Sequence, residues 1–147
     1  MPADPNHDAF AVLPLCWRAA ALGAAVAIAL TAIVGTAVSV LIQWALVFRG
    51  YSPQAAYASM FSSASFIVLG HILGTIYNGV GGYTAASLTA SRPIAHGAAA
   101  GVGGLLFAVV VFAGPISNPL PFWSVALWFL VPIPAAILGA YIYARQA

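Results

Sequence analysis

Residues 19–48 read AAALGAAVAIALTAIVGTAVSVLIQWALVF, a run of 30 residues that contains no charged side chain. A helix that crosses the hydrocarbon core of a bilayer needs about 20 predominantly apolar residues at a rise of 1.5 Å each. Uninterrupted apolar runs of this length are typical of membrane-spanning helices rather than of buried helices in soluble domains. The stretch therefore predicts that the chain enters a membrane.

The composition of the whole chain agrees with this prediction. Hydrophobic residues make up 63% of the 147 residues, charged residues make up 4%, and the mean hydropathy is +1.03. A soluble domain carries about 25% charged residues, because its surface faces water. A chain of this length forms one domain, so most of its surface must face lipid. We expect a single membrane domain over residues 19–147, preceded by a short tail of residues 1–18.

Three further apolar segments follow the first. The last two are separated by Gly114–Pro121, which contains three prolines and is expected to be a loop, because proline lacks an N–H and disfavours helix before it. Pro132 and Pro134 should kink the final span near its middle. The expected fold class is all-α: a polytopic membrane protein with four transmembrane helices in a compact bundle. The expected spans are about 19–48, 55–87, 95–114 and 122–144.

The second span has a clear predicted start. Ser52 followed by Pro53 is typical of a helix N-cap and first helical residue. From there we expect one long helix over about residues 53–87, loosened, if anywhere, at Gly79–Gly82.

The arginines predict the orientation. With four crossings, Arg18, Arg92 and Arg145 fall on one side of the membrane and Arg49 on the other. Positive loop charge is retained in the cytoplasm, so both termini and the tail are expected to be cytoplasmic, the tail lying free or at the interface. Alanine richness and the use of arginine without lysine indicate a bacterial protein, and hence the bacterial inner (plasma) membrane.

Small residues recur at helical spacing and predict helix contacts. Helices in lipid associate through close backbone approach and interhelical hydrogen bonds, so faces rich in small or weakly polar residues mark protein contacts. The glycines expected at such contacts are Gly70, Gly74, Gly82, Gly97, Gly101 and Gly104. On the first span the expected stripe is Ala25, Ala29, Ala32, Thr36, Ser39 and Gln43. The same stripes could serve an oligomer or a partner subunit.

His71 is the one side chain expected within the bilayer that could titrate near neutral pH. Thr75 and Asn78 follow on the same helical face. This row could bind a polar ligand or relay a proton; the competing interpretation is a neutral imidazole bonded to a hydroxyl or carbonyl of a neighbouring helix. Haem through His71 is disfavoured, because an axial pair needs a second histidine at equal depth and His96 lies near the inner interface. No cofactor is therefore expected.

Arg92 and His96 lie in the predicted inner-interface loop between the second and third spans. They are interpreted either as a contact for an anionic headgroup or a partner, or as an interfacial turn that obeys the positive-inside rule. Asp4, His7 and Asp8 resemble a metal site only in composition, so no metal site is expected. No span contains a carboxylate, and no phosphate-binding loop or CxxC motif is present. We therefore assign no catalytic residues and expect no enzyme.

Residues 79–104 read GVGGYTAASLTASRPIAHGAAAGVGG. This segment resembles one found in small four-span bacterial inner-membrane proteins of uncharacterised function, in which a GGYxAA-type string ends one helix and an RPxxHG-type turn opens the next. The matching positions are Gly81, Gly82, Tyr83, Ala85, Ala86, Arg92, Pro93, His96 and Gly97. The resemblance implies a compact four-helix inner-membrane protein and implies no activity.

Two functions are compatible with these features. The small-residue faces favour a structural or accessory subunit that packs into a larger membrane assembly or against its own copies. The alternative is a small channel or transporter with a polar pathway along His71, Thr75 and Asn78. The expected partners are the lipid bilayer and other transmembrane subunits or further copies of the chain. Nucleic acid is excluded, since four scattered arginines form no basic patch.

Overall fold

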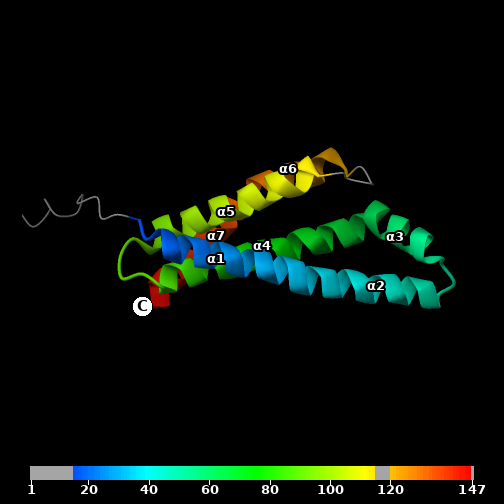
Figure 1. Cartoon of the computed structure of the whole chain (residues 1–147), viewed down its shortest axis with the longest axis horizontal. Coiled ribbons are helices and arrows are strands. Elements are labelled where there is room, and N and C mark those ends of the chain that lie inside the picture. The colour runs from blue at the N-terminus through cyan, green and yellow to red at the C-terminus, as the bar shows by residue number, and fades with distance from the viewer. Residues whose placement is uncertain (1–14, 115–119, 147) are drawn as a thin grey trace, which may run out of the picture.

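The computed structural model describes residues 15–114 and 120–146, and within them every regular element is a helix (Figure 1). This confirms the all-α fold class. The predicted loop is described only at its two ends, and most of the predicted tail, including Asp4, His7 and Asp8, lies outside the described residues. In chain order the elements are α1 (Trp17–Leu30), the π-helical turn η2 (Thr31–Gly35), α2 (Thr36–Phe48), α3 (Pro53–Ser62), α4 (Ala64–Ser87), α5 (Pro93–Ala113), α6 (Phe122–Leu130) and α7 (Pro132–Gln146).

Several of these helices match the dimensions of a bilayer. Trp17–Phe48, Ala64–Ser87 and Pro93–Ala113 are each long and apolar enough to cross a membrane, and α6 and α7 supply a fourth crossing if the bent pair is one span. The first of them runs without a break for 32 residues, about 48 Å at 1.5 Å per residue. The 21 residues of α5 correspond to about 32 Å. The chain is thus an all-helical protein with the dimensions of a multi-pass membrane protein.

The second predicted span is interrupted at an unexpected place. Ser63 adopts an extended conformation (φ −80°, ψ 118°) and separates α3 from α4. The hydroxyl of Ser62 donates to two carbonyls of its own helix, at 3.0 and 3.1 Å, and such local bonds compete with the helical ladder. The expected single helix over about residues 53–87 is therefore wrong, and Gly79–Gly82 lies inside regular α4. The predicted N-cap is confirmed: Ser52 accepts a hydrogen bond from the backbone N–H three residues later, at 3.2 Å.

The predicted kink in the final span is confirmed. α6 ends at Leu130 and α7 begins at Pro132, with a bend of 41° between the two helices. Pro132 has no N–H to donate to the carbonyl four residues earlier, and its ring clashes with that carbonyl. The chain therefore changes direction at this point.

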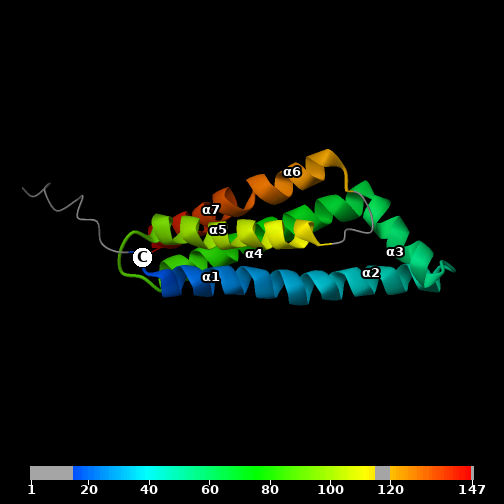
Figure 2. The same cartoon turned by 45° about the horizontal axis from the view of Figure 1, so that its top comes forward.

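The helices are packed at one end and splayed at the other. α1, α4, α5 and α7 run side by side at the end where the C-terminus lies, here called the closed end (Figures 1 and 2). Arg18, Arg92 and Arg145 belong to this end, and Arg49 lies at the opposite, open end. There α2 diverges from α4, and α3 bridges the gap (Figure 2). Among the described residues, α2 approaches α3 closely but not α4.

Glycines explain why the closed end is closed. α4 lies between α1 and α7, and a Cβ built on Gly81 would lie 2.6 Å from the carbonyl oxygen of Gly23 in α1. A Cβ built on Gly82 would lie 2.6 Å from the Cα of Ala136 in α7. Carbon atoms in contact stay about 3.5–4.0 Å apart, so both positions exclude any side chain. Backbone approach of this kind is a main source of helix association in lipid.

α5 joins the closed end by the same means. A Cβ on Gly101 would lie 2.7 Å from the Cα of Ile133 in α7. Gly97 also faces α7, and Gly104 faces the side chain of Asn78 in α4. The predicted packing glycines that lie at helix contacts are thus Gly82, Gly97, Gly101 and Gly104.

Two predicted contacts are wrong. A Cβ on Gly70 or Gly74 would meet no atom within 4 Å, because both glycines lie in the part of α4 from which the neighbouring helices diverge. The alanine half of the stripe expected on the first span is also not packed, since Ala25, Ala29 and Ala32 are exposed. Alanine occurs on every face of this helix and so does not indicate which face packs. The residues buried in α1 are Ala19, Ala20, Gly23 and Ala27. The other half of the stripe, Thr36, Ser39 and Gln43, faces the space between α2 and its neighbours, and the side-chain nitrogen of Gln43 donates to the carbonyl of Pro53 in α3 at 3.2 Å.

Candidate functional site: a cleft at the open end

The splayed helices enclose a cleft with a volume of about 440 Å³. Its walls come from α1, η2, α2, α3 and α4, and its floor reaches α5 and the break between α6 and α7. Tyr57 and Val40 line it and are also exposed, at 45% and 43%, so the cleft opens to the surroundings. Most lining side chains are aliphatic or aromatic, and among the described residues no Asp, Glu, Lys or Arg lines it. Concave apolar sites of this size, with a few polar groups, are the usual form of small-molecule sites.

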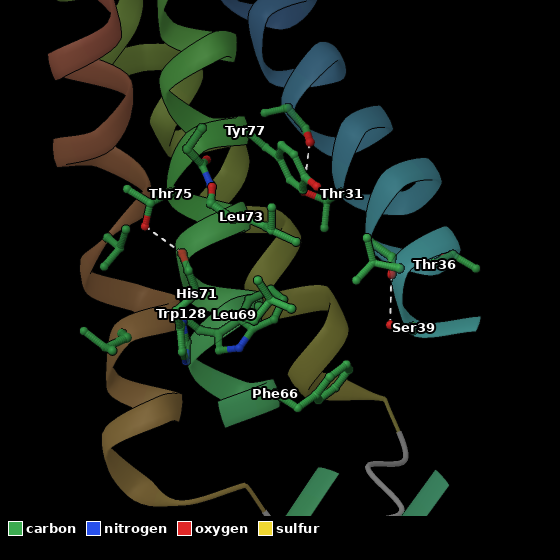
Figure 3. A pocket seen from close by; sticks show the side chains of 18 of the residues that line it. Thr31, Thr36, Ser39, Phe66, Leu69, His71, Leu73, Thr75, Tyr77 and Trp128 are labelled. Carbon is green, nitrogen blue, oxygen red and sulfur yellow. Dashed lines mark hydrogen bonds between the residues drawn. The ribbon is translucent and has the colours of Figure 1, made fainter. Parts of the chain in front are cut away.

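The π-helical turn η2 forms part of the wall. Thr31 and Gly35, its first and last residues, both line the cleft. The hydroxyl of Thr31 donates to the carbonyl of Ala27 at 2.9 Å, and that of Ser39 donates to the carbonyl of Gly35 at 2.9 Å. Both hydroxyls are thus bonded within their own helix (Figure 3). π-Helical turns inside α-helices are rare and occur frequently at functional sites.

Two polar side chains of α4 enter the cleft without satisfying all their hydrogen-bonding groups. Tyr77 is 7% exposed and projects from α4 toward the helix that carries Thr31 (Figure 3). Its hydroxyl is buried and has no hydrogen-bond partner. The amide nitrogen of Asn78 donates to the carbonyl of Gly74 at 2.8 Å, whereas its oxygen, Oδ1, is buried without a partner. Buried polar groups in proteins are nearly always paired, and each exception calls for an explanation.

His71 has a partner on a neighbouring helix. Its Nε2 lies 2.8 Å from the hydroxyl of Ser124 in α6, a side chain that is completely buried. The imidazole ring also lies near two indoles, with centroid distances of 5.8 Å to Trp123 and 6.3 Å to Trp128. This arrangement matches the interpretation of His71 as an imidazole bonded to a hydroxyl of a neighbouring helix.

The predicted polar row is found at one site, but its members have different surroundings. His71, Thr75 and Asn78 all line the cleft. The hydroxyl of Thr75 donates to the carbonyl of His71 at 2.7 Å, within α4. Tyr77, on the adjacent face, was missed by the sequence analysis. The signal that could have identified it is its position inside an apolar span, where a tyrosine hydroxyl needs a partner.

Arg92 and His96 lie far from the cleft, at the closed end. His96 is 2% exposed; its Nε2 accepts the backbone N–H of Cys16 at 2.9 Å, and its Nδ1 lies 3.0 Å from the carbonyl of Arg92. A carbonyl only accepts, so Nδ1 carries the proton and the ring is the neutral Nδ1–H tautomer. Arg92 has a left-handed backbone (φ 52°), and its carbonyl also accepts the N–H groups of the first turn of α5. The two residues thus tie the start of α1 to the start of α5.

Comparison with known proteins finds no matching family model, curated protein or solved structure. Among residues 15–114 and 120–146, no three His, Cys, Asp or Glu side chains come together in a group that could hold a metal ion. The cleft is therefore interpreted from its own chemistry.

Proposed function

We propose that this protein is a non-enzymatic accessory component of a membrane assembly, and that it holds an apolar molecule from the bilayer in the cleft. The observation that carries the proposal is the contrast between the two ends of the molecule. At the closed end, glycines allow the helix backbones to touch. At the open end, the helices enclose a cleft of about 440 Å³ that is lined mostly by apolar side chains. A cavity with apolar walls that opens toward lipid is filled favourably by an apolar molecule, because atoms that line empty space lack van der Waals contacts that a bound molecule supplies.

We propose that the cleft, rather than the glycine stripes, is the surface that performs the function of the protein. Gly82, Gly97, Gly101 and Gly104 are already packed within the chain, so they support the bundle and are not free to receive another subunit. Contacts with other subunits or with further copies of the chain must then use other faces of the helices.

We further infer four crossings, with α6 and α7 as one bent span, in the bacterial inner membrane. Three arginines at the closed end and one at the open end support a cytoplasmic closed end under the positive-inside rule. A lone cysteine placed at Ser52, after replacement of Cys16 by serine, should react with an impermeant thiol reagent added to intact cells. Protection of that thiol would contradict the orientation.

Native mass spectrometry after gentle extraction tests the main proposal, because it identifies bound small molecules and co-purifying chains in one measurement. We expect stoichiometric foreign chains or further copies, and an apolar molecule bound to the wild type. Gly74→Phe should lose that molecule, because its ring would occupy the open space beside Gly74. The matched control is Ile72→Phe, at an exposed position of the same helix that does not line the cleft. A lone monomer with an empty cleft would contradict the proposal.

A channel or transporter is the second candidate, favoured by the presence of His71, Thr75 and Asn78 in one cleft beside the 41° bend. A pathway that leads from the cleft through the closed end would require α1 and α4 to separate at Gly23 and Gly81, where the two helices are in backbone contact. Under this hypothesis His71→Ala abolishes a flux while the variant stays folded. An unchanged flux would reject it.

A further inference from the structure

A groove with a volume of about 370 Å³ lies between α4 and α7. Its floor consists of Gly79, Ala135 and Gly139, small residues at which the two helices touch. Larger apolar side chains, each between 41% and 57% exposed, form its walls: Ile76 and Val80 of α4, and Leu138 and Ile142 of α7. The groove is therefore open to the surroundings, and Thr75 is the only described residue that it shares with the cleft.

The groove runs from one end of α4 toward its middle. Tyr83, at one end of the groove, lies four residues before the last residue of α4, or about 6 Å at 1.5 Å per residue. Thr75, at the other end, lies about 12 Å further along the helix. Tyrosines are enriched where headgroups meet hydrocarbon, and here the rings of Tyr83 and Tyr143 meet edge to face at 5.4 Å. The groove thus spans the depth that the upper part of an acyl chain occupies.

A positive charge stands at the interfacial end of the groove. Arg145 follows Ile142 by three residues, so its side chain leaves α7 on the face that forms the groove wall. Its guanidinium carbon lies 4.9 Å from the ring centroid of Tyr141. The next residue, Gln146, accepts a hydrogen bond from the hydroxyl of Tyr83 at 3.1 Å, which joins the two walls at this end.

The charge of the chain favours an anionic ligand at this position. Both acidic residues, Asp4 and Asp8, precede residue 15, so no described carboxylate is available to pair with Arg145. The planar guanidinium matches the geometry of phosphate. Basic pockets between transmembrane helices on the cytoplasmic side bind anionic lipid headgroups. Charge and apolar walls together therefore point to an anionic lipid.

The floor of the groove favours an acyl chain over another helix. Helices in lipid associate through close approach of their backbones at small residues. Here the small residues, Gly79 and Gly139, are already in contact with each other. A helix 10–12 Å in diameter would rest on the exposed walls, whereas a chain of methylene groups is thin enough to reach the floor.

We propose that the groove binds one acyl chain of an anionic phospholipid whose phosphate pairs with Arg145. The apolar walls hold the chain, and the arginine selects headgroups with a net negative charge. This site goes beyond the proposed function, because it lies outside the cleft and takes a different class of lipid.

Native mass spectrometry of the full-length, delipidated protein tests the headgroup preference. The protein is titrated with phosphatidylglycerol or with phosphatidylcholine of the same acyl chains, and the apparent dissociation constant of the first bound lipid is measured. One arginine near a membrane surface changes the affinity for an anionic lipid by about 5-fold. We expect the wild type to prefer phosphatidylglycerol by about this factor and Arg145→Gln to lose the preference. The matched control, Arg18→Gln, removes the same charge from α1, which does not contact α7 within the described residues, and should keep it.

Gly79→Leu tests whether the chain occupies the groove. A Cβ at Gly79 would lie 3.6 Å from the carbonyl oxygen of Ala135, an ordinary contact, so the new side chain starts from the floor of the groove without a clash at its Cβ. We expect it to lose bound phosphatidylglycerol at concentrations that saturate the wild type. Gly70→Leu is the matched control: it lies on the same helix, lines the cleft rather than the groove, and should keep the lipid.

Three outcomes would overturn the proposal. Equal affinity of the wild type for the two lipids, or an equal loss of preference in Arg145→Gln and Arg18→Gln, would show that Arg145 does not bind the headgroup. Retention of phosphatidylglycerol by folded Gly79→Leu would show that the chain lies elsewhere. A dimer that forms without lipid and is lost in Gly79→Leu would show that a second copy of the chain covers the groove. The two arginine variants leave the helix contacts intact, so they decide the headgroup site even if Gly79→Leu does not fold.

Discussion

Replacing Gly82 with alanine tests whether backbone contact between α4 and α7 holds the closed end together. The new Cβ would lie 2.6 Å from the Cα of Ala136, whereas carbon atoms in contact stay about 3.5–4.0 Å apart. The helices must therefore separate by about 1 Å, and no rotamer change can relieve a clash with backbone. Overpacking costs about 1–3 kcal/mol. Because the obstacle is backbone, we expect the upper part of this range, a loss of about 2–3 kcal/mol in the free energy of unfolding.

Gly70→Ala is the matched control on the same helix. A Cβ at Gly70 meets no atom within 4 Å, so the change adds no clash. The helical preference of alanine over glycine is about 1 kcal/mol in water. Helices in lipid keep their backbone bonds even when separated, so we expect a gain between zero and about 1 kcal/mol. Both variants are measured as full-length protein in mild detergent, by SDS titration followed by tryptophan fluorescence.

A pair of rescue variants makes the test sharper. The Cβ of Gly103→Ala would lie 2.5 Å from the Cβ of Ala24 in α1, a side-chain atom. Ala24→Gly should therefore restore the stability of Gly103→Ala. Ala136→Gly should not restore Gly82→Ala, since the obstructing atoms are backbone. Wild-type stability in Gly82→Ala, or its rescue by Ala136→Gly, would refute the argument that α4 and α7 meet backbone to backbone.

Three further predictions concern the links between helices. His96→Ala should lower the free energy of unfolding by about 1–3 kcal/mol and speed amide exchange at Cys16, whose N–H it leaves unpaired; unchanged exchange would contradict the tie between α1 and α5. A double-mutant cycle of His71→Ala and Ser124→Ala should give a coupling of about 0.6 kcal/mol, the average for such bonds in a membrane protein; additive effects would show that the pair does not interact. Arg92→Gly should be more stable than Arg92→Ala by about 1–2 kcal/mol, because both lose the side chain but only glycine adopts φ 52° without strain; equal stabilities would argue against the left-handed conformation.

The polar row on α4 shows how much of the candidate site could be predicted. Helical periodicity places His71, Thr75 and Asn78 on one face, and all three line the cleft. The partner of His71 could not be predicted, because the hydroxyl bonded to it comes from Ser124, 53 residues further along the chain. The unpaired hydroxyl of Tyr77 is a property of the space around it, which no local pattern describes.

The glycines of α4 show the same limit of sequence-based prediction for the fold. Gly70, Gly74 and Gly82 belong to one row of residues spaced by four, which passes through Asn78, yet of the three only Gly82 touches another backbone. The four-residue repeat is a property of one helix, whereas a contact requires a second helix at the same height. No second helix reaches Gly70 and Gly74, which line the cleft between the splayed helices. The break at Ser63 lies at the same end of α4, and there a local serine pattern was not recognised as an end of a helix.

By itself, the sequence determined the helical class, the positions of the apolar segments, the cap at Ser52 and the kink at Pro132. These features are local, because lipid requires each segment to satisfy its own backbone and proline breaks a helix wherever it stands. Only the tertiary structure decided which glycines pack, that Ser63 divides a predicted span, and that the open end encloses a cleft with two unpaired polar atoms. Those features arise from the relative placement of helices distant in sequence, and in lipid that placement depends on shape and hydrogen bonding between faces rather than on hydrophobicity.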